Sequence, residues 1–147
     1  MMLAALVTIV AASGAVAEPQ PRVDVFKTAT CGCCAKWVEH LRAHGFAATA
    51  TDVTNLDAVK TQHGVPPAVR TCHTATVGGY VIEGHVPAAD IKRWLKERPA
   101  IAGLAVPAMP IGSPGMEGPN PQPYDVLAFD KRGTTRVFAT HGATHGR

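Results

Sequence analysis

Three of the chain's four cysteines fall within four consecutive positions, in the run Cys31-Gly32-Cys33-Cys34. The stretch before this run, 23–27, is mostly apolar and predicts a β-strand. From 33 to 44 apolar residues recur at helical spacing, and Gly45 marks the end of the predicted helix. The thiols therefore lie at a helix N-terminus, where unpaired N–H groups and the helix dipole favour thiolate over thiol. Such a cluster indicates sulfur chemistry rather than packing.

Residues 1–17 are apolar or small and end in Ala15-Val16-Ala17, the pattern that a signal peptidase cuts. No Lys or Arg precedes the apolar run, and the run is shorter than the about 20 residues that span a bilayer. We therefore expect a signal peptide over 1–17, a single domain over 18–140 and a flexible tail over 141–147. Export to the periplasm would place the cysteines in an oxidising compartment, where a disulfide or a bound metal protects thiols.

The composition limits the classes of partner. The 147 residues suit one compact domain, and the net charge of +3 with 17% charged residues is ordinary for such a domain. No block of basic residues is present, so nucleic acid is not expected as a partner. Beyond residues 1–17, no segment is apolar enough to predict a membrane span.

The order of the predicted elements is β-α-β-α-β-β-α. After the first strand and helix we expect a strand at 47–53 and then a short helix, capped by Asn55 or Thr54 and ending near Gly64. A hairpin at 74–77 and 80–82 should follow, with its turn at Gly78-Gly79, and then a helix at 87–97. Periodicity alone predicts an α/β domain, and the order resembles a three-layer thioredoxin-like domain. In thioredoxin-like proteins, the residue before the third strand lies against the reactive cysteines. By that resemblance Cys72 and His73 would meet the first cluster.

A segment rich in Pro, Gly and Ala runs from 99 to 123. Apolar residues occur along it, so we expect a loop that lies on the domain rather than a disordered linker. Segments 124–129 and 135–139 flank a turn and predict a closing β-hairpin, which would extend the thioredoxin-like domain.

Two kinds of chemistry are open to the cysteines. Cys31 and Cys34 have the C-x-x-C spacing of a thiol–disulfide redox pair. A third thiol beside such a pair, Cys33, could form a disulfide with the wrong partner. Soft thiolates select Cu(I), zinc or iron–sulfur clusters. A tetrahedral zinc site could use Cys31, Cys33 or Cys34, Cys72 and His73. Neighbouring helical side chains diverge by about 100°, which favours several Cu(I) ions bridged by thiolates over one zinc. An iron–sulfur cluster is the weakest option for an exported chain.

Several motifs occur in an order that resembles the CopG-like family, periplasmic proteins associated with copper resistance. They are Cys31-Gly32-Cys33-Cys34, Gly64-Val65-Pro66-Pro67, Cys72-His73-Thr74, Gly78-Gly79-Tyr80-Val81-Ile82-Glu83-Gly84-His85-Val86-Pro87, Ala108-Met109-Pro110 and Gly112-Ser113-Pro114-Gly115-Met116-Glu117. The resemblance covers about 23–138. It implies a thioredoxin-like fold and copper held by Cys31, Cys33, Cys34 and Cys72, with storage, relay and redox conversion all open.

Other soft donors accompany the cysteines. We include His73 as a ligand or hydrogen-bond partner, and Met116 as a thioether that its Gly-Pro loop could bring to the site. The expected metal set is therefore Cys31, Cys33, Cys34, Cys72, His73 and Met116, with no catalytic residue assigned. Whether Met109, His85, His40 or His44 assist is left open, and His85 is expected to fix the turn before the last helix.

Three classes of function follow. The first is a periplasmic protein that binds copper, as Cu(I), for sequestration or relay, with another envelope copper-handling protein as a partner. The second is a thiol–disulfide or copper oxidoreductase that uses Cys31 and Cys34. The third is a structural protein in which all four cysteines form two disulfides.

Overall fold

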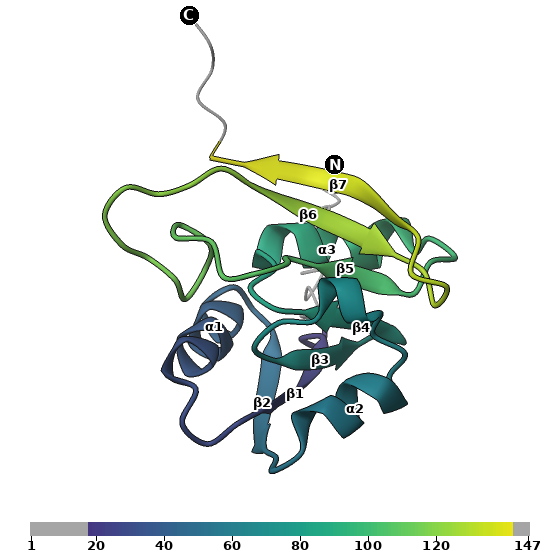
Figure 1. Ribbon diagram of the computed structural model, residues 1–147, viewed down its shortest axis with the longest axis horizontal. Helices are drawn as coiled ribbons and strands as arrows, with labels where there is room; N and C mark the ends of the chain where they lie inside the picture. Colours follow the sequence, from purple (N-terminus) through teal and green to yellow (C-terminus); the bar gives the residue numbers. More distant parts are fainter. Residues whose placement is uncertain (1–17, 143–147) are drawn as a thin grey trace, which may run out of the picture.

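The structure, a computed structural model, describes residues 18–142, and the predicted signal peptide lies outside this range. Seven strands form one sheet in the order β2-β1-β3-β4-β5-β6-β7 (Figure 1). The elements are β1 (Arg22–Lys27), α1 (Gly32–Ala43), β2 (Ala47–Asp52), α2 (Leu56–Gln62), the 3-10 helix η1 (Pro67–Val69), β3 (Thr74–Val77), β4 (Tyr80–Glu83), α3 (Ala88–Glu97), β5 (Gly103–Ala105), β6 (Tyr124–Phe129) and β7 (Thr135–His141). The α/β class and the closing hairpin are therefore confirmed. The thioredoxin-like assignment stays a prediction.

The core lies on both faces of the sheet. Successive residues of a strand point to opposite faces. Ile82 packs in the main apolar cluster together with Trp37 of α1 and Trp94 of α3. Its strand neighbour Val81 belongs to a second, smaller cluster with Phe129. Helices α1 and α3 therefore cover one face of the sheet, and the smaller cluster fills the other.

The hairpin of β3 and β4 forms as predicted, with Gly78 and Gly79 at φ +57° and +87°. Its antiparallel register places Thr74 opposite Glu83. Continuing this register beyond the strands aligns residue 72 with residue 85, since each step back from 74 matches a step on from 83. The turn therefore decides which residues meet at the open end of the hairpin.

Strand β5 was not predicted, because its three residues lie within the segment assigned to a loop. It pairs in parallel with β4 and antiparallel with β6, so backbone hydrogen bonds to two neighbours hold it in the sheet. Such a short strand has no periodicity of its own from which to predict it. Strand β7 extends to His141, one residue past the predicted end of the domain, and His141 Nε2 lies 2.6 Å from Asp90 Oδ2.

The loop between β5 and β6 lies against the start of α1 (Figure 1). It closes on itself through backbone hydrogen bonds from the Gly112 N–H to the Met116 carbonyl and from the Met116 N–H to the Ser113 carbonyl. Buried Ser113 adds a side-chain bond to the Pro110 carbonyl. The Pro/Gly segment therefore lies on the domain as expected, and the structure shows that it covers the N-terminus of α1.

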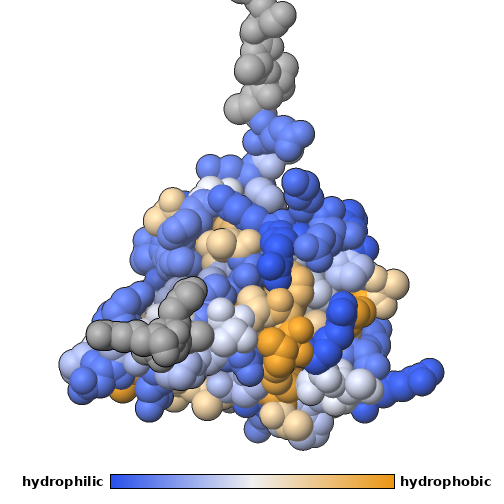
Figure 2. All heavy atoms as spheres, turned by 90° about the horizontal axis from the view of Figure 1, so that it is seen from above, coloured by the Kyte–Doolittle hydropathy of each residue, from blue (hydrophilic) through white to orange (hydrophobic). Residues whose placement is uncertain are grey.

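Hydrophilic residues cover most of the face seen in Figure 2, and a small apolar group lies near its centre. Among residues 18–142 the exposed large hydrophobic side chains are Met109 and Val137. Within the same range, no helix combines the length and apolar character needed to cross a membrane.

Candidate metal centre

The first cysteine cluster lies at the N-terminus of α1. Cys31 is the N-cap residue, with extended backbone and no capping side-chain hydrogen bond, and Cys33 and Cys34 follow in the first turn. Cys34 is fully buried, whereas Cys31 and Cys33 are partly exposed. The unpaired N–H groups of this turn favour negative charge on sulfur.

Cys31 and Cys34 form a disulfide, with their Cα atoms 5.3 Å apart. Cys33 and Cys72 are free thiols, so the interpretation in which all four cysteines form two disulfides is wrong for this structure. Cys33 Sγ lies 3.6 Å from Cys31 Sγ. Cys31 and Cys34 are thus joined to each other, and the two free thiols lie beside them.

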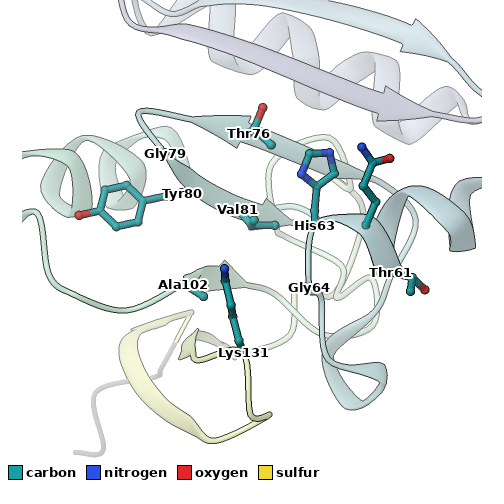
Figure 3. A pocket seen from close by; sticks show the side chains of 10 residues that line it. Thr61, His63, Gly64, Thr76, Gly79, Tyr80, Val81, Ala102 and Lys131 are labelled. Carbon is teal, nitrogen blue, oxygen red and sulfur yellow. The ribbon is translucent and has the colours of Figure 1, made fainter.

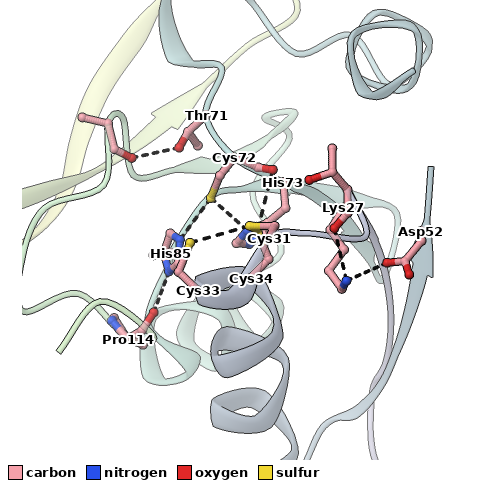
Figure 4. Close-up of a disulfide and its surroundings, with 12 residues drawn as sticks. Lys27, Cys31, Cys33, Cys34, Asp52, Thr71, Cys72, His73, His85 and Pro114 are labelled. Atoms are coloured by element: carbon pink, nitrogen blue, oxygen red, sulfur yellow. Dashed lines mark hydrogen bonds and ion pairs between the residues drawn. A yellow bond between two sulfur atoms is a disulfide. The ribbon is translucent and has the colours of Figure 1, made fainter. Parts of the chain in front are cut away.

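All four sulfur atoms lie within 4.8 Å of one another (Figure 4). Cys72, which precedes β3, contributes the sulfur that lies far in sequence from the other three. The Cys72 carbonyl oxygen lies 3.7 Å from Cys34 Sγ. Burial, and then the neighbouring Cys33 thiol, raise the pKa of Cys72 to about 11. Cys72 is therefore a neutral thiol near pH 7, and a metal that binds it must displace its proton.

His85 joins Cys72 from the other side, a role that the sequence interpretation did not assign. Its Nε2 lies 3.0 Å from Cys72 Sγ, and its Nδ1 lies 2.7 Å from the Pro114 carbonyl oxygen (Figure 4). A carbonyl only accepts, so Nδ1 carries the hydrogen and Nε2 presents a lone pair toward the sulfur. The hairpin register, which aligns 72 with 85, is the signal that could have found this residue.

His73 is fully buried and its Nδ1 lies 3.3 Å from Cys72 Sγ. Its ring packs on Trp37, with centroids 4.4 Å apart, and edge-on to His85. Burial, and then the neighbouring His85 and Lys60 side chains, hold the pKa of His73 well below its usual value. His73 is thus a neutral imidazole, the form that binds metals. Cys72, His73 and His85 form a second group of donor atoms within 4.8 Å of one another.

Met116 lies in the loop that covers α1 and lines a pocket there with Cys33 and Lys36. The structure therefore places it on the Cys33 side of the centre, partly buried. Met109 is 46% exposed.

His40 and His44 also lie outside the two groups. His40 Nε2 accepts a hydrogen bond from the Ala88 N–H at the start of α3, and the His44 ring bonds the His40 carbonyl. Both rings therefore have structural partners within the fold.

We expect intact-mass analysis to show which thiols are free. Alkylation in denaturant without reductant should add two groups, at Cys33 and Cys72, and prior reduction should raise this to four. Four groups without reductant would contradict the disulfide, and none would restore the interpretation with two disulfides.

Comparison with known proteins gives two kinds of match. A family model described as "Protein of unknown function, DUF411" matches residues 69–116. Two solved structures titled as copper resistance protein CopG are each 43% identical to this chain. Form 1 has a TM-score of 0.79 and covers 86% of this chain and 100% of its own, and form 2 has a TM-score of 0.78 and covers 83% and 98%. The chain belongs to the CopG family of copper resistance proteins. No curated protein matches it.

The CopG resemblance inferred from the motifs is thus confirmed. The 69–116 match contains Cys72 and His85 but not the C-x-C-C run. The CopG structures extend the likeness to 83% and 86% of the chain.

A separate pocket lies between α2, β3 and β4, where His63 and Lys131 are among its lining residues (Figure 3). None of the cysteines lines it. The donor groups at the start of α1 are therefore the better candidate for a metal centre in this CopG-family chain.

Proposed function

We propose that this chain is a periplasmic protein that binds copper, as Cu(I), in a site with more than one ion bridged by cysteine thiolates, for sequestration or relay in copper resistance. The observation that carries the proposal is the mutual approach of four sulfur atoms to within 4.8 Å. Soft sulfur donors prefer Cu(I), and the CopG relatives are titled as copper resistance proteins.

The proposed ligands are Cys31, Cys33, Cys34, Cys72, His73 and Met116, to which the geometry adds His85. Two features support several ions over one. Cys33 and Cys34 are adjacent on a helix and diverge, and Cys72 belongs to both donor groups. A bridging Cys72 thiolate would let one ion bind among the cysteines and another toward the imidazoles.

The disulfide makes copper binding depend on reduction. Cys31 and Cys34 cannot offer thiolates while they are joined. Two electrons and two protons convert the disulfide to two thiols, and Cu(I) then displaces the thiol protons. The oxidised chain retains only Cys33 and Cys72 as thiols.

The location follows from the apolar segment at residues 1–17, which we propose directs export to the periplasm. Metal loading in that compartment would require a supply of both Cu(I) and electrons. An envelope copper-handling protein would serve as donor or acceptor of the ion.

Titration tests the proposal. The chain beginning at Glu18, reduced and kept anaerobic, should bind more than one Cu(I) in competition with a chromophoric chelator. The oxidised chain, measured in parallel without reductant, should bind less because two ligands are absent. No tight binding by the reduced chain would overturn the proposal.

A second function, a thiol–disulfide or copper oxidoreductase, is favoured by one observation: the C-x-x-C disulfide at a helix N-terminus. Its test is turnover. Catalytic reduction of insulin disulfides or of Cu(II), lost in Cys31→Ser, would establish it. Stoichiometric copper binding without turnover would instead support the copper-binding function.

A further inference from the structure

A buried ion pair lies behind Cys72 and His73. Lys60 Nζ, from α2, lies 2.6 Å from Glu83 Oε1 and 3.0 Å from Thr74 Oγ1. The Lys60 side chain is 3% exposed and the Glu83 side chain is 0% exposed. Sequence patterns did not single out either residue, since both fall in elements whose periodicity is set by their apolar neighbours.

The Glu83 carboxylate contacts the chain on both sides of the Cys72-His73 dipeptide. The Thr71 N–H donates to Oε1 at 2.7 Å, and the Thr74 hydroxyl donates to Oε2 at 2.7 Å. With Lys60, three donors converge on one carboxylate. The main chain adds a bond from the Gly84 N–H to the His73 carbonyl. The two residues that carry donor atoms are thus held from both flanks by one side chain.

Fold stability alone gives little reason for this arrangement. Taking two charges out of water is costly, and replacing a buried ion pair with apolar residues of similar volume is often neutral or stabilising. A buried carboxylate with several good hydrogen bonds instead fixes the backbone that it contacts. Here that backbone is the segment bearing Cys72 and His73.

We propose that Glu83, whose charge is balanced by Lys60, is a positioning residue of the metal centre. It orients Cys72 and His73 so that Cys72 Sγ takes part in both donor groups. The inference rests on the proposed copper function. It assigns the buried pair to metal affinity, acting through Cys72 and His73, rather than to holding the fold together.

The test is a double-mutant cycle on the reduced chain beginning at Glu18. Glu83→Gln keeps the shape of the side chain but removes its charge and one acceptor. We expect it to weaken Cu(I) binding about 10- to 100-fold, the range seen when partners of metal ligands are removed. In a Cys72→Ser background, the same change should weaken the remaining binding by less than about threefold, because only its effect on His73 remains.

Urea unfolding of all four proteins separates positioning from folding. A merely structural role would give the same loss of affinity in both backgrounds, in step with the loss of stability, and would overturn the inference. Unchanged affinity in Glu83→Gln would also overturn it while leaving the copper function intact. Failure of the unsubstituted chain to bind Cu(I) would instead remove the proposed function, and the inference with it.

Two further comparisons keep the test decisive if Glu83→Gln does not fold. Thr74→Val removes one anchor and should weaken Cu(I) binding, whereas Thr74→Ser retains the hydroxyl and should restore it. Asp90→Asn is the matched control, since Asp90 is also a buried carboxylate, with His141 Nε2 2.6 Å from its Oδ2, but lies on α3. It should lower stability without changing copper affinity, and an equal loss of affinity there would contradict the specificity of Glu83.

Discussion

Cys72→Ser is expected to reduce copper binding more than any other single substitution in the chain. Cys72 Sγ belongs to the group of four sulfurs and also to the group with His73 and His85. Its loss should lower the number of Cu(I) ions per chain and weaken binding by more than about 100-fold, beyond the effect of removing a partner of a ligand. Anaerobic titration against a chromophoric chelator measures both quantities.

Cys33→Ser is the matched control. It removes the other free thiol, which belongs to the sulfur group alone. We expect it to lower stoichiometry by less than Cys72→Ser does. Both variants keep the Cys31–Cys34 pair. Their free energies of unfolding should lie within about 1 kcal/mol of that of the parent protein, because serine replaces cysteine at partly exposed positions. Equal losses in the two variants would show that Cys72 is not shared between the groups.

Gly115→Ala is expected to destabilise the fold by roughly 2 to 4 kcal/mol, through a left-handed backbone and steric overlap together. Gly115 has φ +87° in the loop over α1. An added Cβ would lie 2.8 Å from the Cys33 carbonyl oxygen and 2.9 Å from the Trp37 backbone nitrogen. Neither backbone atom can move without shifting the helix that carries the cysteines. Urea unfolding gives the stability change, and Cu(I) titration should show weakened binding as the loop lifts.

Gly79→Ala provides the control for the backbone term. Gly79 also has φ +87°, but an added Cβ there would meet no atom within 4 Å. We expect it to lose only about 1 to 2 kcal/mol and to keep its copper affinity. If the two alanine variants lost the same stability, the close packing of the loop on α1 would make no contribution.

Local sequence patterns predicted most of the elements that carry the site. The helix after Cys31, the Asn55 cap and the Gly78-Gly79 turn all depend on neighbours within a few residues, and all are confirmed. The meeting of Cys72 with the first cluster came from family resemblance rather than from periodicity, and the structure brings these sulfurs together.

The remaining features depend on contacts between distant segments. Strand β5 exists because β4 and β6 supply hydrogen bonds on its two sides. The Lys60–Glu83 pair joins α2 to β4, and no single-residue pattern predicts which buried lysine meets which glutamate. His85 lies between these cases, since the register of the predicted hairpin aligns it with Cys72, although the sequence analysis did not use this register.

The hydrogen bond from His85 to Pro114 spans 29 positions, and the contact from Cys34 to Cys72 spans 38. An unfolded chain therefore holds the C-x-C-C thiols together but keeps Cys72 and the imidazoles far from them. A complete donor set exists only after the sheet and its covering loop have assembled. By mass action, copper should then stabilise the native state over the unfolded one, so a newly made chain would gain its full affinity for the metal as the last event of its maturation.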